Sequence, residues 1–152
     1  MAGRKWPGEG CRSETYADSG AGAPHELQDE FRDLRRLLLL HPVPGAIEQM
    51  RAAVAATHHG FDAMVAELAT AATVERGERW LEGTFALHAR RRGNGVGYDS
   101  ICAAGDHANT LHWIKNTGEV REGDLVLIDA GVEVDSLFTA DVTRTFPVSG
   151  TF

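Results

Sequence analysis

The sequence predicts an α+β fold, in which the helices come first and the strands follow. Between residue 26 and about residue 91, hydrophobic side chains recur at helical spacing in three separate segments. From about residue 98 to residue 148, short apolar or alternating segments are separated by turn residues. This order favours α+β over alternating βαβ units, and the length of 152 residues is that of about one domain.

The N-terminal part of the chain divides into two predicted regions. Residues 1–25 are rich in glycine, serine and charge with little periodic hydrophobicity, which predicts a disordered leader. Residues 26–40, ELQDEFRDLRRLLLL, carry one apolar stripe at helical spacing and predict a helix, which the prolines of HPVPG end. We therefore interpret residues 26–44 as a helix and linker of uncertain origin.

Two further helices are predicted before the strands. In the first, apolar or small side chains step by three and four along one face: Ile47, Met50, Val54, Thr57, Phe61, Met64 and Leu68. The second spans about 76 to 91, with Leu81, Phe85 and His88 on one side, and the glycines of GNGVG end it. These side chains are the predicted helical contribution to the core.

Four strands are predicted from the short apolar segments of the second half. They are YDSICAAG, TLHWI, DLVLIDAG and LFTADVTRTFPV, and the turn-rich segments DHAN, KNTGEVREG and EVDS separate them. Cys102 lies within the first strand without a neighbouring histidine to activate it, which predicts a small buried side chain rather than a nucleophile.

Charge and cysteine content exclude several classes of protein. With 15 Lys and Arg against 22 Asp and Glu the net charge is −7, which argues against nucleic acid as a partner. Cys11 and Cys102 lie far apart without a Cys-x-x-Cys spacing, so we expect reduced thiols and a cytoplasmic protein. No apolar run approaches the roughly 18 residues of a membrane span, so we expect no membrane association.

Two carboxylates raise the question of function. Asp129 follows a wholly apolar strand, where an ionised carboxylate without partners costs several kcal/mol. Strand alternation places Asp141 on the face of its segment that also carries Thr139, Thr143 and Thr145, so Asp141 can face the end of the strand that carries Asp129. Either turn amides at Ala130 and Gly131 compensate these carboxylates or the two share a divalent cation, for which Asp oxygens are suitable ligands.

His112 is a third candidate, since it lies between apolar neighbours in TLHWI. An imidazole there either packs as a hydrogen-bonded core group or projects into a site as a proton carrier or oxyanion donor. Taken alone, His112 favours the core role.

A family resemblance connects these residues. The segment YDSICAAGDHANTLHW and the segment EVREGDLVLIDAGVEVDSLFTADVTRTFPVSGTF resemble the catalytic domain of Xaa-Pro aminopeptidases, the aminopeptidase P and prolidase branch of the pita-bread metallopeptidases. The likeness is strong over about 98–152 and looser back to about 46. It implies the first half of a pita-bread fold, two or three helices followed by an antiparallel sheet, with residues 46–152 as a partial catalytic domain.

The resemblance also implies site residues. Family members hold two divalent ions, most commonly manganese, with two aspartates, one histidine and two glutamates, and the aspartates match Asp129 and Asp141. His112 matches a histidine near the scissile bond that stabilises the transition state or moves protons. Arg144, within TRTFP, matches a structural residue that fixes neighbouring carboxylates. The histidine and glutamate ligands of the family follow this segment, beyond Phe152.

The implied activity is metal-dependent hydrolysis that releases an N-terminal residue preceding proline from a peptide. Because three of five metal ligands are absent, we expect this chain to be a truncated form that is inactive on its own. Apolar surface left uncovered by a missing half predicts a homo-oligomer or a complementing C-terminal half. Two alternatives stay open: a prolidase-type dipeptidase, and a non-catalytic pita-bread domain that binds a peptide or partner.

Overall fold

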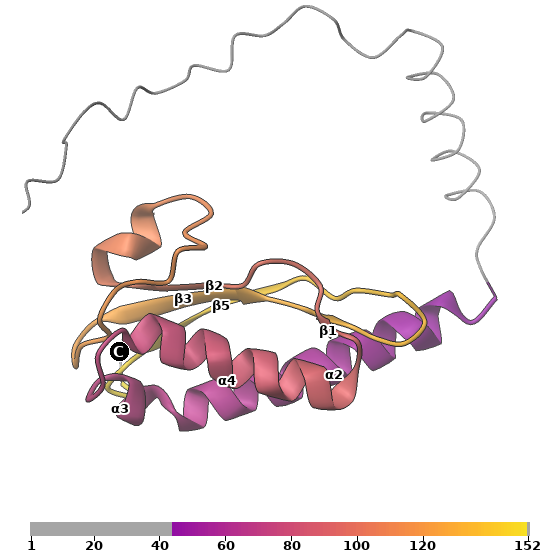
Figure 1. The fold of residues 1–152 in the computed structure, drawn as a ribbon, viewed down its shortest axis with the longest axis horizontal. Helices are drawn as coiled ribbons and strands as arrows, with labels where there is room; N and C mark the ends of the chain where they lie inside the picture. Colours follow the sequence, from indigo (N-terminus) through magenta and orange to yellow (C-terminus); the bar gives the residue numbers. More distant parts are fainter. Residues whose placement is uncertain (1–43, 152) are drawn as a thin grey trace, which may run out of the picture. The chain divides into compact units, whose positions relative to one another are not determined.

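The computed structural model describes residues 44–151 (Figure 1). The predictions for residues 1–25 and for the helix at 26–40 lie outside the described residues. In chain order the elements are the helices α2 (Ala46–Ala66), α3 (Leu68–Ala71) and α4 (Gly77–Arg92), the strands β1 (Gly95–Val96) and β2 (Ile101–Ala104), the 3-10 helix η1 (Gly105–Asn109), and the strands β3 (Leu125–Ala130), β4 (Val132–Glu133) and β5 (Val142–Pro147).

Helix α2 confirms the predicted stripe over its C-terminal part. Thr57, Phe61 and Met64 are buried, whereas Ile47 and Met50 near the N-terminus are 65% and 40% exposed. The predicted helix also divides, because Glu67 interrupts it and Leu68 begins the one-turn helix α3. The apolar stripe is therefore longer than the surface that the rest of residues 44–151 covers.

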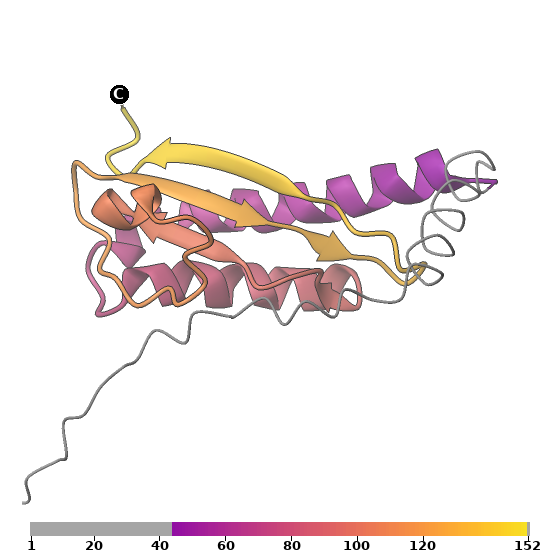
Figure 2. The same cartoon turned by 90° about the horizontal axis from the view of Figure 1, so that it is seen from above.

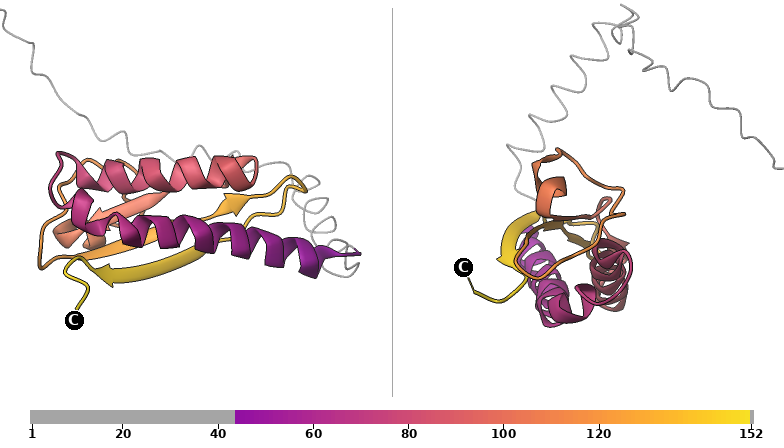
Figure 3. Two further views of the ribbon diagram at one scale, coloured as in Figure 1. Left: turned by 90° about the horizontal axis from the view of Figure 1, so that it is seen from below. Right: turned by 90° about the vertical axis from the view of Figure 1, so that its left-hand side faces the viewer.

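Helix α4 matches the predicted span and lies beside α2 (Figure 3). Leu81 and Phe85 are fully buried, and the ring of Phe85 meets that of Phe61 edge-on at a centroid distance of 6.0 Å. Gly93 follows the helix in an extended conformation, at the predicted end. The two helices thus form one apolar layer under the sheet.

The sheet is antiparallel and has the strand order β2-β3-β5, with a separate short ribbon of β1 and β4 (Figure 2). Strands β2 and β3 lie within the segments predicted for them. Strand β5 begins at Val142, later than predicted. Of the residues before it in the predicted segment, only Thr139 pairs with another strand, through an isolated bridge to Glu133. The predicted α+β class, with helices before an antiparallel sheet, is confirmed.

The prediction of a strand at TLHWI is wrong. These residues form turns, and Leu111 and Ile114 are 85% and 49% exposed. A strand needs a neighbouring backbone to pair with, and the free edge of β2 is already occupied by side chains. The side-chain oxygen of Asn116 accepts a hydrogen bond from the backbone N–H of Cys102 at 2.9 Å. The side-chain nitrogen of Asn116 donates to the backbone carbonyl of Ser100 at 2.8 Å.

The helices cover one face of the sheet, and η1 with the loop that follows it lies over the other face (Figures 1 and 3). In β3, Val126, Ile128 and Ala130 are buried in the core, whereas Leu127 and Asp129 alternate with them and are half-buried. In β5, Val142 and Phe146 pack against the same core, as the predicted alternation requires. Among residues 44–151, none of the helices combines the length and apolar character needed to cross a bilayer.

Candidate functional site

Asp129 lies on the face of the sheet that the helices do not cover. It is the fifth residue of β3, and the strand register pairs it with Ile101 of β2 and Thr143 of β5. Because β3 is the central strand, neighbouring strands hold the backbone of Asp129 on both sides. Its carboxylate therefore projects from a fixed position.

Gly131 brings the segment before β5 close to the end of β3. A Cβ atom at Gly131 would collide with the backbone carbonyl of Ala140, and the Ala140 amide donates to the Val132 carbonyl at 3.2 Å. Only a residue without a side chain permits this approach. Asp141 follows Ala140 directly, so the close contact places Asp141 beside the end of β3.

The phenol of Tyr98 joins the two carboxylates. Its oxygen lies 2.7 Å from Asp129 Oδ1 and 3.0 Å from Asp141 Oδ1. Burial, followed by the hydrogen bonds to the two carboxylates, raises the pKa of Tyr98 far above its ordinary value, so the phenol stays protonated. Within residues 44–151 no amide of Ala130 or Gly131 donates to either carboxylate, so turn amides are not what compensates them.

His112 is exposed and has a left-handed backbone, with φ at 52°. The core role that His112 favours when taken alone is therefore wrong. His112 and Asp129 instead line one hollow of about 240 Å³ between the sheet and the loop after η1. The other lining residues are Ile101, Ala103, Ala108, Asn109, Thr110, Leu111, Leu127 and Thr143.

Arg144 lies in β5, where its side chain is exposed. Its guanidinium donates to the Thr143 carbonyl at 2.7 Å. Among the described residues it forms no ion pair with a carboxylate, so its role in fixing the acidic groups stays a prediction.

Cys102 is fully buried as expected, and burial raises the pKa of its thiol.

Sequence reasoning missed Tyr98 and Glu78. Tyr98 precedes β2 in the segment that carries the family resemblance, but nothing in its own spacing points to two distant carboxylates. Glu78 lies in the first turn of α4, where acidic residues are common at a solvated helix terminus. Its complete burial is visible only in the fold.

The acidic pair suits a hard divalent cation. Two carboxylates contribute two negative charges, while the single hydroxyl between them has one proton to donate. Carboxylate oxygens are the ligands preferred by calcium, magnesium and manganese. Within residues 44–151 no three or more His, Cys, Asp or Glu side chains cluster in a way that could hold a metal ion.

The sequence of residues 48–152 matches the profile of the family described as Metallopeptidase family M24. The chain belongs to metallopeptidase family M24. The chain is also 54% identical over 127 residues to Xaa-Pro aminopeptidase 2 of Streptomyces coelicolor, a match that covers 84% of this chain and 26% of the relative. Human Xaa-Pro aminopeptidase 3 is 36% identical over 140 residues, which cover 91% of this chain and 26% of the relative.

Solved structures of M24 peptidases share this fold. An alanine variant of Escherichia coli aminopeptidase P, in complex with substrate, superposes with a TM-score of 0.62 and 34% identity, over 72% of this chain and 24% of that one. A zinc-substituted form of the same enzyme, in complex with product, matches equally well. The predicted resemblance and the pita-bread fold are confirmed, and the chain spans about a quarter of the length of these relatives.

Proposed function

We propose that this M24 chain contributes the two aspartate ligands of a metallo-aminopeptidase site that releases an N-terminal residue preceding proline. The meeting of Asp129 and Asp141 at one hydroxyl, beside a hollow that His112 also lines, carries the proposal. The names of the relatives support the substrate class, a peptide with proline in second position.

In this proposal Asp129 and Asp141 hold divalent metal, most commonly manganese as the family resemblance implies. When bound, the metal polarises the peptide carbonyl and lowers the pKa of water towards neutrality. The Tyr98 hydroxyl lies within hydrogen-bond distance of both carboxylates and donates its single proton to one of them at a time. It thereby keeps the two carboxylates next to each other. The resemblance implies three further ligands, a histidine and two glutamates.

His112 is proposed to act on the substrate from the loop side of the hollow. An imidazole there is able to donate a hydrogen bond from a ring nitrogen to a developing oxyanion or to transfer a proton. Asp129 comes from the sheet and His112 from the loop, and both line the same hollow, so a peptide bound there would contact the carboxylate of Asp129 and the imidazole.

The test is a calorimetric titration of the chain with Mn²⁺, in parallel with hydrolysis of a peptide with proline in second position. We expect Mn²⁺ binding that weakens by more than about tenfold in Asp129→Asn and in Asp141→Asn. Asp135→Asn is the matched control, since it makes the same change at an exposed turn residue close in sequence to Asp141.

The outcomes separate the alternatives. Equal Mn²⁺ affinity in all three variants and the parent would refute the metal role of Asp129 and Asp141. Peptide binding without metal binding would favour the non-catalytic binding module. Cleavage of a dipeptide in preference to a longer peptide would favour a prolidase-type dipeptidase.

A further inference from the structure

The carboxyl group of Glu78 is fully buried and forms hydrogen bonds with four groups. Its Oε1 atom lies 2.9 Å from the Ala104 amide and 2.8 Å from His107 Nδ1. Its Oε2 atom accepts from Trp113 Nε1 at 2.9 Å and from the Gly118 amide at 2.6 Å. A polar group is tolerated in the interior only where such partners replace water, and four partners match the capacity of a carboxyl group.

The four donors belong to one segment, residues 104–118, which we name the site loop. The Ala104 and Gly118 amides lie at its two ends, and His107 and Trp113 lie within it, with their rings stacked at a centroid distance of 3.9 Å. Glu78 therefore ties both ends and the middle of the loop to a single buried point on α4. Removal of one acceptor would release several of these ties together.

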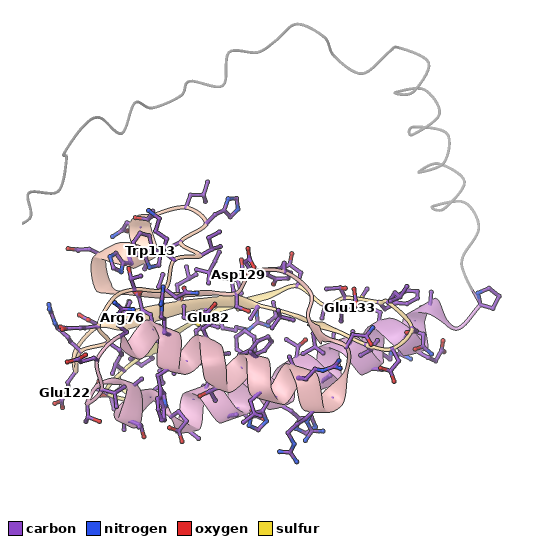
Figure 4. All side chains as sticks on the ribbon, viewed as in Figure 1. Arg76, Glu82, Trp113, Glu122, Asp129 and Glu133 are labelled. Carbon is purple, nitrogen blue, oxygen red and sulfur yellow. The ribbon has the colours of Figure 1, made fainter. Side chains whose placement is uncertain are left out.

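The site loop contains His112, immediately before Trp113. Figure 4 shows Trp113 in the loop on the same side of the sheet as Asp129. The positive φ of His112 is a sparsely populated conformation that persists only where the surroundings hold it. Within the loop the Ile114 amide donates to the His112 carbonyl at 2.8 Å, and the bond from Trp113 to Glu78 is the tie next to His112 that leads to another element.

We infer that Glu78 is a positioning residue, which fixes the site loop so that His112 lines the hollow beside Asp129. Glu78 touches no part of that hollow and acts through the loop alone. The inference rests on the proposed function for the importance of His112, whereas the restraint on the loop is independent of it.

The first experiment compares two variants of one helix. Glu78→Gln keeps the size of the side chain and replaces one acceptor oxygen by a donor group. Glu82→Gln makes the same change one turn further along α4, at a residue that makes no hydrogen bond to the site loop. We expect the Trp113 indole N–H to exchange with solvent about tenfold faster, or more, in Glu78→Gln and at the parental rate in Glu82→Gln.

The second readout reports the position of His112. Bound Mn²⁺ broadens the NMR signals of nearby rings, so the His112 signals are compared with those of Tyr98, which touches both aspartates. In Glu78→Gln we expect the broadening of the His112 signals by Mn²⁺ to decrease relative to the broadening of the Tyr98 signals. A loss of overall stability alone would not change this ratio, and an unchanged ratio would overturn the inference.

Failure of the proposed function is distinguishable from failure of this inference. If Mn²⁺ broadens neither ring in the parent chain, the metal site fails and indole exchange alone decides whether Glu78 holds the loop. If Glu78→Gln does not fold, Trp113→Phe replaces it, because this variant keeps an aromatic ring and loses only the Nε1 donor. An unchanged His112 ratio in Trp113→Phe would also overturn the inference.

Discussion

A methyl group at residue 131 should destabilise this chain and disturb the acidic pair. In the Gly131→Ala variant the new Cβ would collide with the Ala140 carbonyl oxygen and approach Tyr98 Cε1 to 3.1 Å. The φ angle of Gly131 is not positive, so the conflict that a methyl group meets there is steric. The obstacle is a backbone group held by the hydrogen bond from Ala140 to Val132.

The magnitude follows from the nature of that obstacle. Forcing one methylene into a well-packed region costs about 1–3 kcal/mol, and a fixed backbone carbonyl places this case at about 3 kcal/mol. A matched substitution has the opposite sign. Gly83 lies inside α4 with nothing within 4 Å of an added Cβ, so Gly83→Ala should stabilise the chain by about 1 kcal/mol through helix propensity.

Urea denaturation of the parent and the two variants measures these differences in the free energy of unfolding. The two glycine-to-alanine changes should differ by about 4 kcal/mol although their chemistry is identical. Mn²⁺ titration of Gly131→Ala should also show weaker binding, because the methyl displaces Asp141 from Asp129. A Gly131→Ala variant as stable as the parent would refute the close approach on which the paired aspartates depend.

Three further predictions concern the core and the buried ionisable groups. Phe85→Ala should lower the free energy of unfolding by about 3–5 kcal/mol in urea, because Phe85 is fully buried against Phe61; a loss below about 1 kcal/mol would contradict this packing. The pKa of Tyr98 is raised above its ordinary value of 10.0, so above pH 10 only the unfolded state loses the phenolic proton and stability falls as pH rises. When the free energy of unfolding is measured against pH, the decrease above pH 10 that is due to Tyr98 should be present in the parent and absent in Tyr98→Phe. Cys102 should resist iodoacetamide in the folded chain and react after unfolding, since burial raises the pKa of its thiol; peptide mass spectrometry that finds rapid native modification would count against the buried strand.

Local periodicity was sufficient to predict much of the fold. The C-terminal part of the α2 stripe, the span of α4 and the apolar run of β3 each depend on neighbours within a few residues, and the structure contains all three. Strand alternation also indicated that Asp141 would face the strand of Asp129, since successive side chains point to opposite faces. The prediction of a strand at TLHWI was wrong because strand formation depends on an available partner edge, which no local pattern encodes.

The residues that support the site depend on contacts between distant parts of the chain. Tyr98 is 31 and 43 residues from the two aspartates it joins, and the donors to Glu78 lie 26 to 40 residues away from it. The sequence by itself determined the order of helices and strands, the candidate aspartates and the family, because these depend on local spacing and on motif residues. Only the tertiary structure decided that Tyr98 joins the aspartates and that Glu78 holds the loop of His112, because a polar side chain finds its partners only when packing removes the water around it.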